Sequence, residues 1–122
     1  MMKDEGKDLR ARTKAFAISV IRMYSSLPKS TAAQVMGKQV LRSGTSVGAN
    51  YREACRSRST AEFIAKLGDC LKELDESSYW FELLEETETV AADTLAPLQK
   101  ECNKLLAIFT TIAKKCKATG KG

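Results

Sequence analysis

The sequence predicts an all-α fold, an antiparallel up-down-up-down four-helix bundle that takes up the whole chain, residues 1–122, as one domain. Four long segments repeat apolar residues at alternating spacings of three and four, the pattern of a helix that buries one stripe. The breaks between these segments are short, so consecutive helices are expected to be antiparallel neighbours. With 43% hydrophobic residues, 29% charged residues and only two prolines, the composition is typical of a helix-rich globular domain.

The first two predicted helices are separated by a proline turn. The first covers residues 8–26 and ends before Pro28, because proline cannot continue the hydrogen-bond ladder. The second covers residues 31–56, and either Ser30 or Thr31 can cap its start. The stripes expected to face the core are Leu9, Thr13, Phe16, Val20, Met23 and Leu27, and then Met36, Val40, Ser43, Val47, Asn50 and Ala54.

The third predicted helix covers residues 59–88 and begins with a capping box. Ser59 and Glu62 stand three residues apart ahead of an apolar run, so each side chain can satisfy a backbone N–H at the helix start. The fourth helix covers residues 94–117, with Pro97 tolerated in its first turn. Their stripes are Phe63, Leu67, Cys70, Leu74, Ser77, Phe81 and Leu84, and then Leu98, Cys102, Leu105, Phe109, Ile112 and Cys116.

An extended coiled coil is the alternative fold, since it shares the spacing of the apolar stripes. The turns at Pro28 and after Glu88 favour the bundle, because they interrupt the helix at intervals that suit a folded-back chain. The last five residues, 118–122, are small or polar and are predicted to be disordered.

The composition excludes several classes of active site. The chain has no histidine, which rules out imidazole acid–base and triad chemistry. Its four cysteines lie far apart, without a CxxC pair, so no familiar zinc site is expected. Three of the four fall on helix stripes, where cysteine behaves as a small hydrophobic residue. We therefore expect reduced, buried thiols, no metal and no cofactor.

The hydropathy pattern predicts no membrane segment. No apolar run approaches the roughly 18 residues that span a bilayer. Residues 1–8 are of mixed charge and lack the apolar core of a signal peptide. These observations predict a cytoplasmic protein.

A stripe of small residues on the second helix predicts a close backbone contact. Residues 43–49 are all small or β-branched, and Gly44 and Gly48 stand four residues apart among them. Each interior glycine costs a helix about 1 kcal/mol relative to alanine, so a neighbouring helix or subunit is expected to approach there. We assign both glycines to an oligomer interface. The same interface is expected to include apolar residues off the stripe of the third helix, namely Tyr79, Trp80 and Leu83. Packing of these side chains inside a broad core is the alternative.

Charge is distributed unevenly along the predicted bundle, whose net charge is +5. The end that gathers residues 1–14, 50–66 and 107–122 carries thirteen basic and five acidic residues, a net +8. The opposite end carries six basic and eight acidic residues, a net −2. Basic surfaces bind nucleic acid through phosphates, by counterion release and with little sequence discrimination. The residues expected to make these contacts are Arg52, Arg56, Arg58, Lys66, Lys114, Lys115 and Lys117.

The carboxylates Glu53 and Glu62 are the one candidate for a catalytic pair. No nucleophile, metal set or pocket signature accompanies them, so the protein is predicted not to be an enzyme. We expect a structural role instead, in which Arg58 neutralises Glu53 or Glu62 while Ser59 and Glu62 cap the third helix.

Residues 42–63 carry a resemblance to a known family. The stretch RSGTSVGANYREA, followed by RSxxEFIAKL, resembles the four-helix-bundle proteins of intervening sequences in bacterial 23S ribosomal RNA. Accessory proteins of diversity-generating retroelements share that architecture. The match extends over residues 12–112 and includes the proline turn at residues 27–30 and the pair of Lys72 and Glu73. Where many relatives read Asn-Ile-Ala-Glu-Gly, residues 50–54 read Asn-Tyr-Arg-Glu-Ala, which adds bulk and charge beside the arginines.

The resemblance implies a cyclic homopentamer with a basic surface. For the retroelement branch it also implies a nucleic acid or a reverse transcriptase as partner. Together with the charge distribution, it leads us to predict a non-catalytic homo-oligomer that binds RNA or DNA through its basic end. The alternative is a scaffold that docks a partner protein such as a reverse transcriptase, with the charge steering association.

Overall fold

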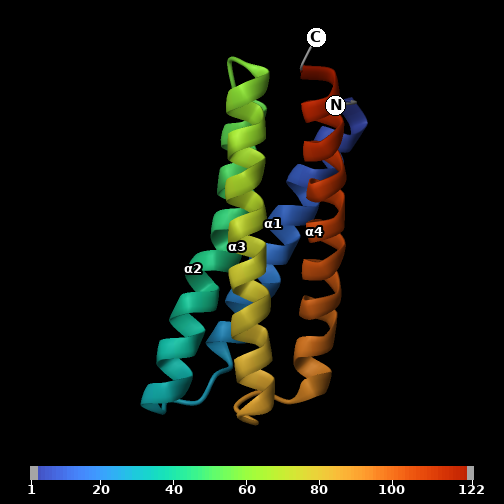
Figure 1. Ribbon diagram of the computed structural model, residues 1–122. Coiled ribbons are helices and arrows are strands. Elements are labelled where there is room, and N and C mark those ends of the chain that lie inside the picture. Colours follow the sequence, from blue (N-terminus) through green and yellow to red (C-terminus); the bar gives the residue numbers. More distant parts are fainter. Residues whose placement is uncertain (1–2, 121–122) are drawn as a thin grey trace.

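The computed structural model describes the backbone of residues 3–120 and the side chains of residues 8–119. This part of the chain forms four α-helices and no strand: α1 is Lys3–Ser25, α2 is Thr31–Cys55, α3 is Thr60–Glu86 and α4 is Ala92–Gly120. The helix backbones approach one another in the order α1–α2, α2–α3, α3–α4 and α4–α1, and across the diagonals side chains meet, as do the rings of Tyr51 and Phe109. The start of α1, the end of α4 and the α2–α3 connection share one end of the rod (Figure 1), so the antiparallel four-helix bundle is confirmed.

Capping residues begin α2 and α3. Of the two candidates at the start of α2, Ser30 is the cap, since its Oγ accepts a hydrogen bond from the Ala33 N–H at 3.3 Å. The Ser59 Oγ accepts one from the Glu62 N–H at 3.1 Å, and a Glu62 carboxylate oxygen accepts one from the Arg58 N–H at 3.4 Å. This reciprocal arrangement satisfies two backbone N–H groups at the start of α3.

The start of α1 and the end of α3 differ from the predicted positions. α1 begins at Lys3, ahead of the predicted start, because lysine and glutamate are good helix formers. α3 ends at Glu86, before the predicted end. The chain then turns through Glu88, whose φ of 57° lies in the left-handed region that terminates helices. The Thr89 N–H bonds to the Leu84 carbonyl at 3.0 Å and closes this turn.

α4 is longer than predicted at both ends. It begins at Ala92, which places Pro97 in the second turn rather than the first. Residues 118–120 of the tail predicted to be disordered are helical, and residues 121–122 lie outside the described part of the chain. Basic residues near the end of α4 complement the negative end of its helix dipole, which explains the extension.

The buried stripe of α2 departs from the prediction near its end. Asn50, predicted to face the core, is half-buried, whereas Tyr51 is fully buried with its ring 5.4 Å from that of Phe109. Five turns of an α-helix contain 18 residues, so Tyr51 lies in line with the buried Ala33. The side chain of Tyr51 therefore fills the core. The sequence suggested instead that its bulk would lie beside the arginines.

Two serines of the predicted stripes meet inside the core. The Ser43 and Ser77 Oγ atoms lie 2.7 Å apart, and both residues are fully buried. The Ser77 hydroxyl also bonds to the Glu73 carbonyl, with an oxygen–oxygen distance of 2.9 Å. This pair links α2 to α3 without leaving a buried hydroxyl unsatisfied.

The close approach predicted at the glycine stripe is made by α1 of the same chain. A Cβ atom on Gly44 would lie 2.9 Å from Val20 Cγ2, and one on Gly48 would lie 3.2 Å from Thr13 Oγ1. Gly44 is buried and Gly48 is half-buried. Because packing of α1 against α2 accounts for both glycines, the reason for assigning Gly44 and Gly48 to an oligomer interface is removed.

Candidate nucleic-acid interface at the basic end

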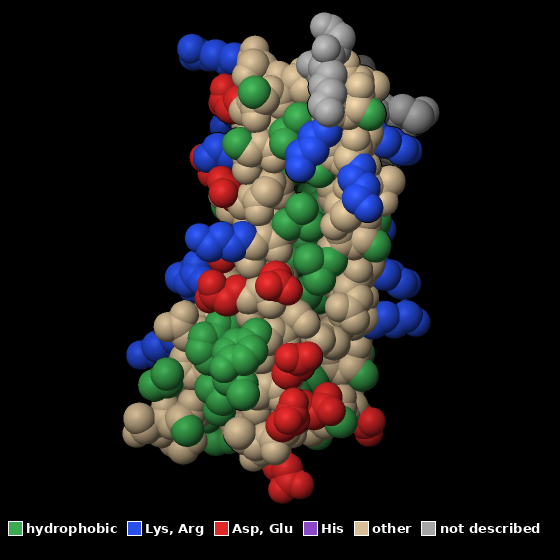
Figure 2. All heavy atoms as spheres, viewed as in Figure 1, with side chains coloured by type: hydrophobic (Ala, Val, Ile, Leu, Met, Phe, Trp, Pro, Cys, Tyr) green, Lys and Arg blue, Asp and Glu red, His purple; other side chains and the backbone are tan. Residues whose placement is uncertain are grey.

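The basic end of the bundle holds the α2–α3 connection, the start of α1 and the end of α4 (Figure 1). On the face shown in Figure 2, most acidic side chains gather in the opposite half of the rod, and basic side chains fringe the half that includes the basic end. Six of the seven predicted contact residues are exposed and make no ion pair within the described residues: Arg52, Arg56, Arg58, Lys114, Lys115 and Lys117.

The three arginines form one corner of the basic end, here called the arginine corner (Arg52, Arg56 and Arg58). A tight connection between α2 and α3 fixes their positions. The Arg56 N–H bonds to the Glu53 carbonyl at 3.0 Å, and the Ser57 N–H bonds to the Ala54 carbonyl at 3.0 Å. α3 begins only three residues after Ser57, so Arg56 and Arg58 lie within a few residues of the first turn of α3.

Lys66 is engaged in an ion pair, unlike the other predicted contact residues. Its Nζ lies 3.2 Å from Glu53 Oε1, and this hydrogen bond raises the pKa of Lys66. The prediction that Arg58 neutralises Glu53 or Glu62 is therefore wrong. Glu53 pairs with Lys66, and the Glu62 carboxylate accepts a hydrogen bond from the backbone of Arg58. The guanidinium group of Arg58 is left available, and Lys66 is not a free cation.

A hollow of about 530 Å³ opens beside the arginine corner, here called the corner hollow. It lies between the α2–α3 connection, the first turn of α3 and the end of α4, and its lining includes Ser57, Arg58 and Phe63. The Ser57 Oγ is buried and has no hydrogen-bond partner among the described residues. Sequence analysis placed Phe63 on the core stripe and gave Ser57 no role. Phe63 is half-buried because it is the first residue of its stripe, at the open end of the bundle. That position in the stripe was the sequence signal that could have indicated its partial exposure.

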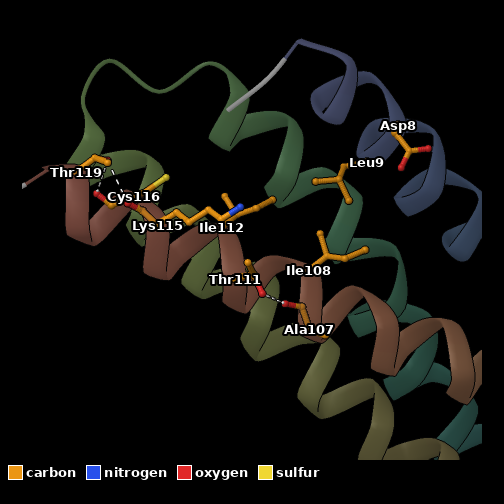
Figure 3. A pocket seen from close by; sticks show the side chains of 9 residues that line it. All are labelled: Asp8, Leu9, Ala107, Ile108, Thr111, Ile112, Lys115, Cys116 and Thr119. Atoms are coloured by element: carbon orange, nitrogen blue, oxygen red, sulfur yellow. Dashed lines mark hydrogen bonds between the residues drawn. The ribbon is translucent and has the colours of Figure 1, made fainter.

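A second hollow separates the start of α1 from the end of α4 (Figure 3). This α1–α4 groove has a volume of about 580 Å³, and Leu9 and Ile108 face the same space from the two helices. The contact between α1 and α4 is the least extensive of the four helix contacts. Arg12 and Glu101 bridge these helices through two hydrogen bonds of 2.8 and 3.1 Å, which raise the pKa of Arg12.

Comparison with known proteins identifies the family. The family model described as 23S rRNA-intervening sequence protein matches residues 7–111, most of the chain. The chain belongs to the family of 23S rRNA-intervening sequence proteins. A solved structure is also similar, the 1.70 Å crystal structure of a protein of unknown function of the S23 ribosomal protein family from Bacteroides thetaiotaomicron VPI-5482. The two sequences are 36% identical, the match covers 89% of this chain and 97% of that chain, and the TM-score is 0.84. No curated protein matches the sequence significantly.

This 23S rRNA-intervening sequence protein also exposes aromatic side chains far from its basic end. Tyr79 is 53% exposed, and its ring lies 5.2 Å from that of the half-buried Trp80. The Trp80 Nε1–H donates to Glu76 at 3.2 Å, and Glu76 also accepts a hydrogen bond from Arg42. A green patch marks this part of α3 in Figure 2. The two aromatic residues and the half-buried Leu83 remain the predicted oligomer interface. Arg42 is linked to Trp80 through Glu76, which accepts a hydrogen bond from each.

The cysteines of this family member are all free thiols. Cys70 and Cys102 are buried, and burial raises the pKa of each to about 12. Cys55 and Cys116 are half-buried and line the corner hollow. Within the described residues, no three histidine, cysteine or acidic side chains are grouped to hold a metal ion. None of the four helices, over the part the structure describes, has an apolar stretch that meets the length and hydropathy of a membrane span.

Proposed function

We propose that this 23S rRNA-intervening sequence protein is a non-catalytic homo-oligomer that binds RNA or DNA through its basic end. The observation that carries the proposal is the group of six exposed cations without an ion pair, three in the arginine corner and three on the last turns of α4. Unpaired cations can each neutralise a phosphate and release a counterion. The family name associates such proteins with 23S rRNA, which makes RNA the first nucleic acid to test.

The geometry supports contacts to phosphates rather than to base edges in a groove. Arginine forks bind phosphate in a bidentate manner, and the corner presents three of them from the last turn of α2 and the connection that follows it. The corner has no helix projecting beyond the bundle that would enter a major groove, within the described residues. Binding of duplexes is therefore expected to be strong at low salt and weakly dependent on sequence.

Assembly into a ring is part of the proposal. The family resemblance implies a pentamer, and the exposed Tyr79 with Trp80 and Leu83 supplies an apolar surface away from the basic end. Subunits whose bundle axes run in the same direction would place their basic ends on one side of the ring. Several copies of the arginine corner would then bind one nucleic acid with an avidity greater than that of a single corner.

The test is the salt dependence of binding to a structured RNA and to a DNA duplex. Six phosphate contacts predict a fall in affinity of about 1,000-fold between 50 and 200 mM salt. The double variant Arg52→Glu and Arg56→Glu is expected to abolish binding in this range. The matched control reverses two exposed lysines at the other end, Lys29→Glu and Lys38→Glu, and is expected to retain binding. Equal loss in both variants, or affinity that is insensitive to salt, contradicts the proposal.

A scaffold that docks a partner protein such as a reverse transcriptase is the second candidate function. The exposed Tyr79 and the half-buried Trp80 favour it, because their surface is apolar and lies apart from the basic end. The scaffold would be supported if the purified protein holds a stoichiometric protein partner and its ratio of absorbance at 260 nm to that at 280 nm indicates no bound nucleic acid. Co-purifying nucleic acid that high salt removes would support binding through the basic end.

A further inference from the structure

The corner hollow is an open depression within the proposed nucleic-acid interface. Its volume of about 530 Å³ falls in the range of roughly 300–1,000 Å³ that small-molecule sites occupy. Polar groups of the α2–α3 connection line one side, and Phe63 with the half-buried Cys55 and Cys116 lines the rest. A planar group with an apolar face and a polar edge suits such a lining.

Ser57 gives the hollow a specific polar feature. Its Oγ is buried and lacks a hydrogen-bond partner among the described residues. An unsatisfied buried hydroxyl is destabilising, so a group that bonds to it gains more than a contact with an exposed serine would provide. Since Phe63 and Ser57 both line the hollow, an aromatic ring and an unsatisfied hydroxyl lie beside the same space.

An isolated anion is a poorer occupant than a planar group. The start of α3 is already capped by Ser59, and the Glu62 carboxylate already accepts a hydrogen bond from the neighbouring Arg58 N–H. A phosphate placed against this helix start would meet that carboxylate, which opposes it electrostatically. Phosphates are better held outside the hollow by the exposed arginine side chains.

We propose that the corner hollow receives one unpaired nucleobase of a structured RNA. The base lies against Phe63, its polar edge bonds to the Ser57 hydroxyl, and Arg58 binds the adjoining phosphate. This inference rests on the proposed function and specifies its substrate, an RNA with a bulged or looped-out nucleotide. A base paired within a continuous helix cannot reach the hollow, whereas unpaired bases are the ones that proteins stack on aromatic side chains.

The experiment compares three RNA hairpins of the same stem at one salt concentration. The first stem is continuous, the second carries a single bulged uridine, and the third carries an abasic nucleotide at the bulge. Stacking of a base on an aromatic side chain contributes about 5- to 150-fold in affinity, the equivalent of 1–3 kcal/mol. We expect the bulged hairpin to bind more tightly than both others by this factor. Equal affinity for all three would overturn the inference.

Two substitutions test the assigned contacts. Phe63→Leu keeps an apolar side chain for the bundle but removes the aromatic face, and Ser57→Ala removes the hydroxyl. Both are expected to lower affinity for the bulged hairpin and to leave the continuous hairpin unchanged, whereas Phe63→Tyr should preserve the preference for the bulge. A melting temperature close to that of the wild-type protein establishes that each variant is folded. Retention of the full preference by folded Phe63→Leu would overturn the assignment.

The outcomes separate this inference from the proposed function. A 4-thiouridine placed at the bulge should cross-link under ultraviolet light to the peptides that contain Ser57 to Phe63 or Cys116 to Thr119. Cross-links confined to other peptides would overturn the inference while leaving electrostatic binding intact. Equal, salt-sensitive binding of all hairpins would do the same. Failure of every hairpin to bind at low salt would overturn both proposals.

Discussion

Replacing Gly44 with alanine tests how closely α1 lies against α2. The added Cβ would lie 2.9 Å from Val20 Cγ2 and 3.0 Å from Val20 Cγ1, closer than real Cβ contacts. Val20 is fully buried and β-branched, so it has little freedom to move away. Overpacking costs about 1–3 kcal/mol, and alanine recovers up to about 1 kcal/mol of helix propensity. We expect the free energy of unfolding to fall by about 1–2 kcal/mol.

Gly68 provides a matched control for this substitution. It lies in the middle of α3, and a Cβ built on it meets nothing within 4 Å. Gly68→Ala is therefore expected to stabilise the protein by about 0.5–1 kcal/mol through helix propensity alone. The same chemical change is predicted to have opposite signs at the two sites, and thermal or urea unfolding followed by circular dichroism measures both.

A double-mutant cycle identifies the atoms responsible. Val20→Ala removes the two methyl groups that Gly44→Ala would meet, so Gly44→Ala should be neutral or stabilising in that background. A Gly44→Ala protein as stable as the wild type would refute the close approach of the helices. Destabilisation that is unchanged by Val20→Ala would refute the assigned contact. A loss that depends on protein concentration would restore the subunit interface as the explanation for Gly44.

Three further predictions concern the helix ends, the core and the thiols. Glu88→Gly should stabilise the protein by about 1 kcal/mol in urea unfolding, because Glu88 adopts a φ of 57° that glycine adopts without cost. Ser43→Ala should destabilise it by about 1–2 kcal/mol, and adding Ser77→Ala should cost less than the sum of the single changes, as a double-mutant cycle would show. Burial raises the pKa of Cys70 and Cys102 from 9.0 to about 12, so their contribution to stability is complete below pH 9 and lost as pH rises toward 12. Urea titrations across this range should show a decline that is smaller when both cysteines are replaced by alanine.

The sequence predicted the helices well because their apolar periodicity is long and regular. The prediction was wrong for the buried residue near the end of α2 and for the end of α4. Tyr51 is buried in place of Asn50 because an α-helix advances by 3.6 residues per turn, and a stripe extrapolated at 3.5 drifts over several turns. The continuation of α4 to Gly120 was missed because small residues indicate disorder only when no preceding helix extends into them.

The candidate site was predictable in its charge and not in its contacts. Exposure of Arg52 and Arg56 follows from their positions off the buried stripe of α2, which ends at Ala54. The ion-pair partner of Glu53 could not be predicted from the sequence, because both Arg58 and Lys66 are near it in the chain. In the folded protein the α2–α3 packing brings Lys66 to Glu53. The corner hollow is beyond sequence analysis for the same reason, since it is formed by side chains of α4 and of a connection more than 50 residues away.

The places where α1 begins and α4 ends have a practical consequence for handling the protein. The start of α1 and the end of α4 both lie at the basic end (Figure 1). An affinity tag, fluorescent fusion or surface linkage that extends α1 or α4 there therefore begins at the basic end, on the surface whose binding is to be measured. The connection at residues 87–91, at the opposite end of the rod, is exposed over most of its length. A single label attached there leaves the basic end free to meet its target.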